Sequence, residues 1–356
     1  MIGLDAILDR IMKRKLIKAL RIQGKASSSA LYRALLAAGE KSSLVTVRRE
    51  LRRLVALGVL AEEGKGRSLL YTLTEYGKLV DQVDARVYCA IEPDARYGAV
   101  GFNFQLLPAI TFDPFSRTQM EEMEAATAYY HEQMHDVSPT LHAKELERFV
   151  IELSWKSSKI EGNTYTLLDT EKLLREGVEA LGHAHAEAQM ILNHKTAFSY
   201  IRAHADRFQT LTRANMEDVH KLLVTELGVT NNLRKKPVGV SGSRYRPLDN
   251  EFQIVEAVEQ LASTVASHCS PYAKALIALV GMSYIQPFED GNKRTSRLMA
   301  NALLLSHHLA PLSYRSVSEE AYREAVLVFY ELNSLVPFAQ LFAEQYVFAA
   351  RNYLAG

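Results

Sequence analysis

The 356-residue sequence contains few cysteines and no long apolar run. Its two cysteines, Cys89 and Cys269, are far apart and in no CxxC pattern, which argues against a disulfide framework and against a zinc site. No segment approaches the roughly 20 uncharged apolar residues that a membrane-spanning helix needs, and charges interrupt the apolar residues near the N-terminus. We therefore expect a protein that has no membrane segment and is located in the cytoplasm.

The composition is that of an ordinary globular protein, with 48% hydrophobic and 23% charged residues. A chain of this length suits two or three packed domains. The net charge of +1 conceals an asymmetry, because residues 1–80 hold 16 Lys and Arg against 7 Asp and Glu, whereas the remainder holds 26 against 34. A basic segment joined to an acidic remainder is typical of a nucleic-acid-binding module, although a solvated basic surface would have the same composition.

Apolar residues at helical spacing predict three short helices in this basic segment. We expect them over residues 4–22, from one of the serines 27–29 to about Gly39, and from Ser42 or Ser43 to about Gly58, with serine caps on the second and third. Val59-Leu60, a GKGR turn and the alternating stretch 68–74 then predict a two-stranded hairpin.

This order of elements resembles the winged helix-turn-helix family over residues 1–80. The resemblance implies that the third helix enters a major groove of DNA. Residues near base edges would then be Ser43, Thr46 and Arg49, and those near phosphates would be Arg48, Arg52, Arg53, Lys65 and Arg67. A dimerisation or docking module without DNA binding is the alternative.

The rest of the sequence predicts a connector and a large helical domain. Residues 81–137 have weak periodicity and are expected to form a connector packed on the domain 138–356. Helical spacing in that domain predicts elements over 139–160, 168–180, 186–204, 214–226, 251–267, 271–285, 292–308 and 319–350. The exception is VGVSGSRY at 238–245, which predicts two short strands around a Ser-Gly turn.

A polar segment, YIQPFEDGNKRTSR at 284–297, separates two strongly apolar helical stretches. Gly291 and Asn292 are expected at the N-terminus of the second helix, where free backbone N–H groups and the helix dipole favour an anion. Arg294 and Arg297 lie one turn apart and suit phosphate oxygens, and Asp290 with Glu289 suits Mg²⁺ held between protein and phosphate. A helix cap with a solvated basic turn is the alternative.

The segment resembles the signature of the Fic family, HPFx(D/E)GN(G/K)RxxR, at every position except the first, and the resemblance extends over roughly residues 100–350. It implies an all-helical domain that transfers AMP from ATP to a hydroxyl of a target protein, with other nucleotide or phosphate transfers in some branches. By this resemblance Asp290 binds Mg²⁺, Asn292 and the Gly291 region hold the α-phosphate, and Arg294 and Arg297 contact the β- and γ-phosphates. Family members also often pair as homodimers.

A second motif, SSKIEGN at 157–163, resembles the inhibitory (S/T)xxxE(G/N) motif found in many Fic proteins. The resemblance implies that a helix over about 139–162 carries Glu161 to an ion pair with Arg297, which displaces the γ-phosphate from its productive pose. Ser157 would hold the end of this helix. A surface glutamate before a glycine stop is the alternative.

A third motif, residues 238–247, resembles the flap of the family, a hairpin whose exposed edge pairs with an extended target segment. Arg234 stands where the family places a basic residue before the flap. The residues implied in docking the target protein are Val238, Val240, Ser241, Gly242, Ser243 and Tyr245.

Gln286 departs from the family at the position of its catalytic histidine. The family's imidazole deprotonates the target hydroxyl, whereas a glutamine amide accepts no proton at any useful pH. Loss of a general base costs on the order of 10²–10⁴ in rate. Three explanations stay open: a natural pseudoenzyme, an altered chemistry that needs no base there, and a substitution introduced into the protein.

The sequence thus predicts a mainly α protein, in which a winged helix-turn-helix precedes an all-helical Fic core with a small β-hairpin flap. The expected function is that of an adenylyltransferase of the Fic type, restrained by Glu161 and weak or inactive because of Gln286. Asn292 and Arg294 would complete its catalytic positions, and its ligands would be ATP, Mg²⁺ and a target protein. The alternative is a non-catalytic transcriptional regulator that binds nucleotide and DNA.

Overall fold

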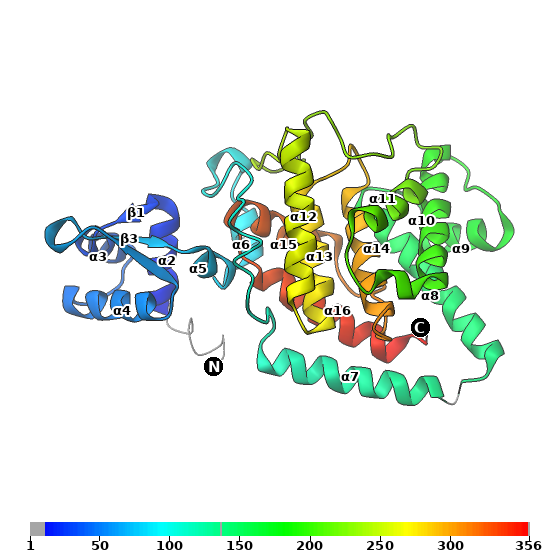
Figure 1. The fold of residues 1–356 in the computed structure, drawn as a ribbon, viewed down its shortest axis with the longest axis horizontal. Helices are drawn as coiled ribbons and strands as arrows, with labels where there is room; N and C mark the ends of the chain where they lie inside the picture. The colour runs from blue at the N-terminus through cyan, green and yellow to red at the C-terminus, as the bar shows by residue number, and fades with distance from the viewer. Residues whose placement is uncertain (1–10, 136, 355–356) are drawn as a thin grey trace.

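The computed structural model describes residues 11–135 and 137–354 of the chain (Figure 1). These residues are mainly helical and include one small antiparallel sheet, which confirms the predicted fold class. The part of the first predicted helix that precedes Ile11 lies outside the described residues. Among the helices that are described, none is both long and apolar enough to cross a lipid bilayer.

The N-terminal unit packs three helices against a sheet with the strand order β1-β3-β2. Its elements are α2 (Ile11–Gln23), β1 (Lys25–Ala26), α3 (Ser28–Ala37), α4 (Leu44–Ala56), β2 (Leu60–Glu63), a 3₁₀ turn η1 (Gly66–Ser68) and β3 (Leu70–Leu73). Ser27 and Ser43 cap α3 and α4 by accepting hydrogen bonds from the backbone N–H groups of Ala30 and Thr46. The strand β1 was not predicted. Apolar side chains of these elements form a hydrophobic core of their own.

The next elements join this unit to the larger helical body. They are α5 (Glu75–Leu79), α6 (Ala85–Cys89), η2 (Pro93–Ala95) and α7 (Arg117–His135). Tyr88 of α6 packs with Val328 and Leu332 in a small apolar cluster. Helix α7 runs along the lower edge of the body beside α16 (Figure 1).

The body consists of nine longer helices among the described residues. They are α8 (Pro139–Ile160), α9 (Leu167–Glu176), α10 (His185–Ala203), α11 (Arg213–Leu223), α12 (Glu251–Ser267), α13 (Pro271–Ile285), α14 (Asn292–Leu305), α15 (Glu319–Leu332) and α16 (Val336–Asn352), with a 3₁₀ turn η3 (Ala205–Phe208). Helices α13 and α14 lie at the centre, because every residue of α13 except Pro271 and Lys274, and every residue of α14 except Lys293, is buried. The loop between these two helices is therefore held on both sides by the core.

Two predicted elements are wrong in detail. The single helix expected over 319–350 is two helices, because Asn333 adopts a left-handed conformation (φ 55°) that ends α15, and Pro337 occupies the first turn of α16. The two strands expected over 238–245 are absent from the described structure of that segment, which contains only the predicted turn, with Gly242 at φ 73°. The second arm of the turn binds elsewhere, since the Arg246 N–H donates to the carbonyl of Val100.

Candidate nucleotide-binding site

The loop between α13 and α14 is shaped by two left-handed residues and one asparagine. Gln286 (φ 52°) ends α13 and Gly291 (φ 76°) precedes the first residue of α14. The side chain of Asn292 accepts a hydrogen bond from the N–H of Phe288 and donates one to its carbonyl, both at 2.8 Å. These two hydrogen bonds hold the loop closed, and the backbone N–H groups in the first turn of α14 remain for a ligand.

Phe288 anchors the loop in the core. Its side chain is fully buried and stacks on His220 of α11, with ring centroids 3.7 Å apart and planes 5° apart. The Nε2 atom of His220 lies 3.0 Å from the carbonyl oxygen of Asp290, so one histidine contacts two residues of the loop. Burial lowers the pKa of His220, which favours the neutral form of this ring.

The loop faces a cavity of about 220 Å³. Four elements contribute to its wall, namely the loop with α14, the end of α8, helix α10 and the segment before the turn at 241–242. The lining residues include Glu161, Met190, Val238, Val240, Ser241, Gln286, Asp290, Gly291, Asn292 and Arg294. Most of the site residues predicted outside residues 1–80 therefore line one small cavity.

Arg294 is a buried cation with incomplete pairing. Its side chain is 2% exposed, and its Nη2 atom lies 3.2 Å from a carboxylate oxygen of Asp290. Its Nη1 atom is buried and has no hydrogen-bond partner among the described residues. Burial also lowers the pKa of Arg294. A buried guanidinium N–H without an acceptor is costly, so this side of the cavity is suited to an anion.

Arg297 is fully buried and fully paired. Its Nη1 atom lies 2.8 Å from Oε1 of Glu161, while Nε and Nη2 donate to the hydroxyl and the carbonyl of Ser157 at 2.9 and 2.8 Å. Lys293 lies 3.7 Å from the other oxygen of Glu161. Burial alone would lower the pKa of Arg297, but the charge of Glu161 and the neighbouring hydroxyl of Tyr322 raise it. The residues of the two sequence motifs thus form one ion-pair network.

Asp290 offers the cavity one accessible carboxylate. Its side chain is 67% exposed and contacts Arg294. Among the described residues no cluster of three or more His, Cys, Asp or Glu could hold a metal ion. A single carboxylate fits Mg²⁺, which commonly takes one or two protein ligands and completes its shell with phosphate and water.

The two arms of the predicted flap have different surroundings. Val238, Val240 and Ser241 line the cavity, whereas the hydroxyl of Ser243 donates to Glu331 of α15 at 2.6 Å. Exposed Gly242 forms the turn between these two arms.

The interpretation of Tyr245 as a docking residue is wrong. The side chain is 1% exposed, stacks on Tyr284, and donates from its hydroxyl to the carbonyl of that residue at 2.7 Å. Tyr245 belongs to the core because the arm after the turn packs inward.

Residues 210–304, which include α11 to α14 and the loop, match the family model described as the Fic/DOC family. The chain contains a Fic/DOC domain. It is 28% identical over 182 residues to "Protein adenylyltransferase Fic" of Drosophila willistoni, an alignment that covers 50% of this chain and 36% of that relative. The chain therefore spans about a third of the relative's length.

Solved structures have the same fold at low sequence identity. Fic-1 from C. elegans superposes with a TM-score of 0.56 at 17% identity and covers 70% of this chain and 74% of that one. A Fic domain containing signaling protein from Bacteroides thetaiotaomicron superposes with a TM-score of 0.55 at 16% identity and covers 65% and 94%. These likenesses concern the fold.

The contacts that two residues make with the loop of the Fic/DOC domain were not predicted. Arg234, 1% exposed, donates from Nε to the carbonyl of Gln286 at 2.6 Å and from its backbone N–H to the carbonyl of Pro287 at 3.0 Å. Tyr330 of α15 contacts the side chain of Gln286. The sequence singled out the position of Arg234 but not its partners, and nothing in the sequence links Tyr330 to the loop.

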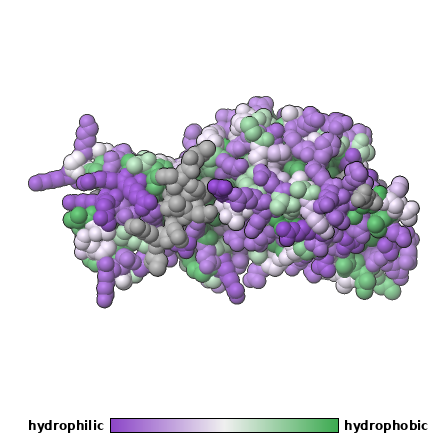
Figure 2. Space-filling model, turned by 90° about the horizontal axis from the view of Figure 1, so that it is seen from below, coloured by the Kyte–Doolittle hydropathy of each residue, from purple (hydrophilic) through white to green (hydrophobic). Residues whose placement is uncertain are grey.

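The residues predicted to contact DNA lie on the N-terminal unit, away from this loop in the fold. Five arginines are exposed, four on α4 and one between β2 and β3: Arg48, Arg49, Arg52, Arg53 and Arg67. The hydroxyl of Ser43 is used as the cap of α4 and lies 3.0 Å from that of Thr46. Helix α4 lies at the lower edge of the N-terminal unit in Figure 1, and the view from below shows a mainly hydrophilic surface there (Figure 2).

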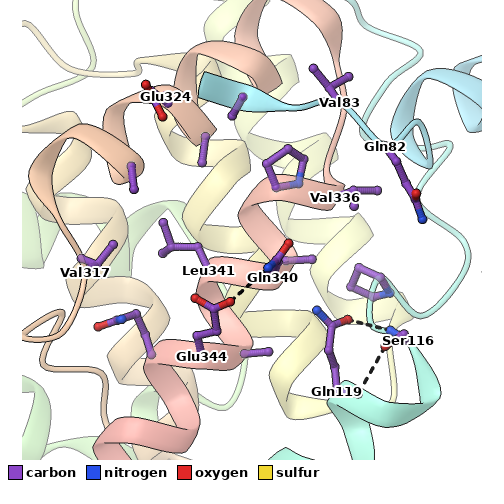
Figure 3. A pocket seen from close by; sticks show the side chains of 18 of the residues that line it. Gln82, Val83, Ser116, Gln119, Val317, Glu324, Val336, Gln340, Leu341 and Glu344 are labelled. Carbon is purple, nitrogen blue, oxygen red and sulfur yellow. Dashed lines mark hydrogen bonds between the residues drawn. The ribbon is translucent and has the colours of Figure 1, made fainter. Parts of the chain in front are cut away.

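A larger cavity of about 1120 Å³ lies outside the Fic/DOC loop and contains none of the predicted site residues. It is bounded by α7, α15, α16 and residues 82–85 (Figure 3). Apolar Val336 and Leu341 line it beside the acidic Glu324 and Glu344. Size alone does not select it as the site, because it lacks the convergent cations of the smaller cavity.

Proposed function

We propose that the Fic/DOC domain binds ATP at the loop between α13 and α14 and is built to transfer AMP to a hydroxyl of a target protein. The observation that carries this proposal is the pair of buried guanidinium groups at the start of α14. Arg294 has an N–H without an acceptor, and Arg297 is held by the partly exposed Glu161. Phosphate oxygens can satisfy both groups, and the helix N-terminus adds backbone donors.

The residues that line the cavity determine where we place each reactant. The α-phosphate would lie at the first turn of α14, and the β- and γ-phosphates would contact Arg294 and Arg297. Asp290 would hold Mg²⁺, which neutralises phosphate charge when bound. A target segment would pair with residues 238–241, and its hydroxyl oxygen would bond to the α-phosphorus as pyrophosphate leaves.

Gln286 limits this reaction. The attacking hydroxyl must lose its proton, and an amide can accept a hydrogen bond from it but cannot remove the proton. Transfer would then be slower by about 10²–10⁴ than with a histidine at this position. The name of the Drosophila willistoni relative, a protein adenylyltransferase, agrees with the proposed reaction class.

Glu161 is assigned an inhibitory role. Its carboxylate accepts a hydrogen bond from the Nη1 group of Arg297, which a γ-phosphate would otherwise contact. Lys293 lies close to the second carboxylate oxygen of Glu161. A triphosphate would have to displace a carboxylate to reach Arg297, which raises the free energy of the productive pose.

A second candidate is a regulator that binds nucleotide without turnover and binds DNA through a winged helix over residues 1–80. Two observations favour it: Gln286 replaces the base, and four arginines of α4 are exposed on one unit. In this case residues 81–137 would connect the DNA-binding unit to the nucleotide-binding domain 138–356, and ATP would change the assembly or the affinity for DNA.

Labelled ATP with Mg²⁺ tests the first proposal. Four proteins are compared by self-modification: the natural chain, Glu161→Gly, Gln286→His and the double variant. We expect the strongest labelling in the double variant and little in the natural chain. If none of the four is labelled although all bind ATP, the transferase function is refuted and the regulator is favoured.

A further inference from the structure

The side chain of Gln286 is held by two groups that the signature does not contain. Its Nε2 atom donates to the backbone carbonyl of Ser283 at 2.6 Å and to the hydroxyl of Tyr330 at 3.2 Å. The Tyr330 hydroxyl in turn donates to the same Ser283 carbonyl at 2.5 Å. Gln286 is 7% exposed and lines the small cavity, while Tyr330 is 1% exposed.

These contacts fix which end of the amide faces the cavity. A carbonyl oxygen only accepts, so the amide nitrogen of Gln286, not its oxygen, must face Ser283. The single hydroxyl hydrogen of Tyr330 is used on that carbonyl, so the hydroxyl accepts the second amide hydrogen. Both donors of the amide are consumed, and the polar atom left for the cavity is the acceptor Oε1.

We propose that Tyr330, acting with the Ser283 carbonyl, is the positioning residue for position 286, and that it makes this position present one hydrogen-bond acceptor to the cavity. With glutamine the acceptor is an amide oxygen, which orients a donor such as a hydroxyl. With an imidazole, the nitrogen nearer Ser283 would carry the hydrogen and the other would face the cavity unprotonated. That tautomer is the one a general base requires.

Tyr330 acts through residue 286 and is not itself a base. Burial, above all, raises the pKa of its hydroxyl, so the group stays protonated. Its ring is fixed by neighbours, with centroids 5.1 Å from Tyr245 and 6.1 Å from Tyr284. The next residue, Glu331, accepts hydrogen bonds from Tyr88 and Ser243, which ties this end of α15 to two further segments.

The test uses Gln286→His in the full chain, with and without Tyr330→Phe, which removes only the hydroxyl. Nitrogen-15 chemical shifts of labelled histidines report the tautomer of the introduced imidazole, identified as the signal absent from the natural chain. We expect one tautomer to predominate in Gln286→His and a mixture in the double variant. Tyr346→Phe is the matched control, because Tyr346 is a buried tyrosine whose hydroxyl instead contacts Thr127. It should leave the tautomer fixed.

That this acceptor serves catalysis rests on the proposed function. A second measurement distinguishes failure of the positioning role from failure of the transferase function. In a Glu161→Gly, Gln286→His background, Tyr330→Phe should lower kcat for AMP transfer by about 10-fold while KM for ATP changes less than about twofold. A mixed tautomer in Gln286→His, or one that Tyr330→Phe does not disturb, would overturn the positioning role. A fixed tautomer without AMP transfer would support that role and refute the transferase function.

Discussion

The carboxylate of Glu161 at the end of α8 lies 2.8 Å from the guanidinium of Arg297 on α14. The two partners differ in environment, since the side chain of Arg297 is fully buried and that of Glu161 is 20% exposed. Ser157 takes the other N–H groups of Arg297 and belongs to the same helix. Glu161 is therefore the partner of Arg297 that a ligand entering from the cavity can replace with the least disturbance of the core.

Glu161→Gln is expected to lower stability and to strengthen nucleotide binding. Loss of the carboxylate leaves the buried charge of Arg297 without its counter-charge, which should cost about 2 kcal/mol of unfolding free energy. ATP with Mg²⁺ should recover this loss and bind roughly 10-fold more tightly than to the natural chain. Urea unfolding with and without ATP, together with calorimetric titration, measures both quantities.

Glu147→Gln is the control for this prediction. Glu147 lies on the same helix and pairs with Arg175, but both side chains are 47% exposed. Exposed pairs contribute little, so its stability and ATP affinity should stay near those of the natural chain. Equal ATP affinity in Glu161→Gln and the natural chain would refute the restraint by Glu161.

The same ion pair predicts a pH dependence. Burial alone would raise the pKa of Glu161, but the charges of Arg297 and Lys293 lower it below its usual value of 4.5. A carboxyl group whose pKa is lower in the folded state stabilises that state at pH values above its pKa in the unfolded chain. This contribution is lost as the pH falls through its pKa in the folded state. The stability difference between the natural chain and Glu161→Gln should therefore be constant above about pH 5.5 and shrink below pH 4.5. Urea unfolding at pH 7, 5.5, 4.5 and 3.5 checks this, and a difference that grows on acidification would contradict it.

The sequence predicted most of the helices, because apolar spacing and capping residues depend only on residues close together in the chain. The helices 251–267 and 271–285 have the predicted bounds, and the predicted serine caps start α3 and α4. The break at Asn333 was missed because apolar spacing continues across it, and only the left-handed asparagine and Pro337 mark the boundary.

The candidate site was predictable where one segment carries it, or where a second motif marks a distant partner, as Glu161 does for Arg297. The segment 286–297 is contiguous, so its helix ends and its cations could be inferred from sequence. Tyr330 lies 44 residues after Gln286, and Arg234 lies 52 residues before it, so their contacts depend on helix packing. The prediction of two strands in the flap was wrong for the same reason, since the partners of its second arm belong to α15 and the connector.

Arg294→Met is expected to weaken ATP binding without lowering the stability of the fold. The substitution removes a buried cation whose Nη1 lacks a partner within the described structure and fills similar volume, so unfolding free energy should be unchanged or slightly higher. ATP affinity should fall by about 10- to 100-fold, because charge-assisted hydrogen bonds to phosphate are lost. Calorimetric titration with ATP and Mg²⁺ measures the affinity. Retained affinity would place the phosphates elsewhere.

Arg49→Ala combined with Arg52→Ala tests the N-terminal unit. Both arginines are exposed on α4, so their removal should spare the fold and weaken binding to duplex DNA. If each contacts one phosphate, the slope of log affinity against log salt should become shallower by about 2. Fluorescence anisotropy with a labelled duplex at several salt concentrations measures the slope.

Lys195→Ala with Arg202→Ala removes the same charge from exposed positions on α10 and should leave the slope unchanged, because α10 lies in the helical body. An equal effect of both double variants would indicate attraction by net charge alone, and no effect of either would identify the unit as a docking module.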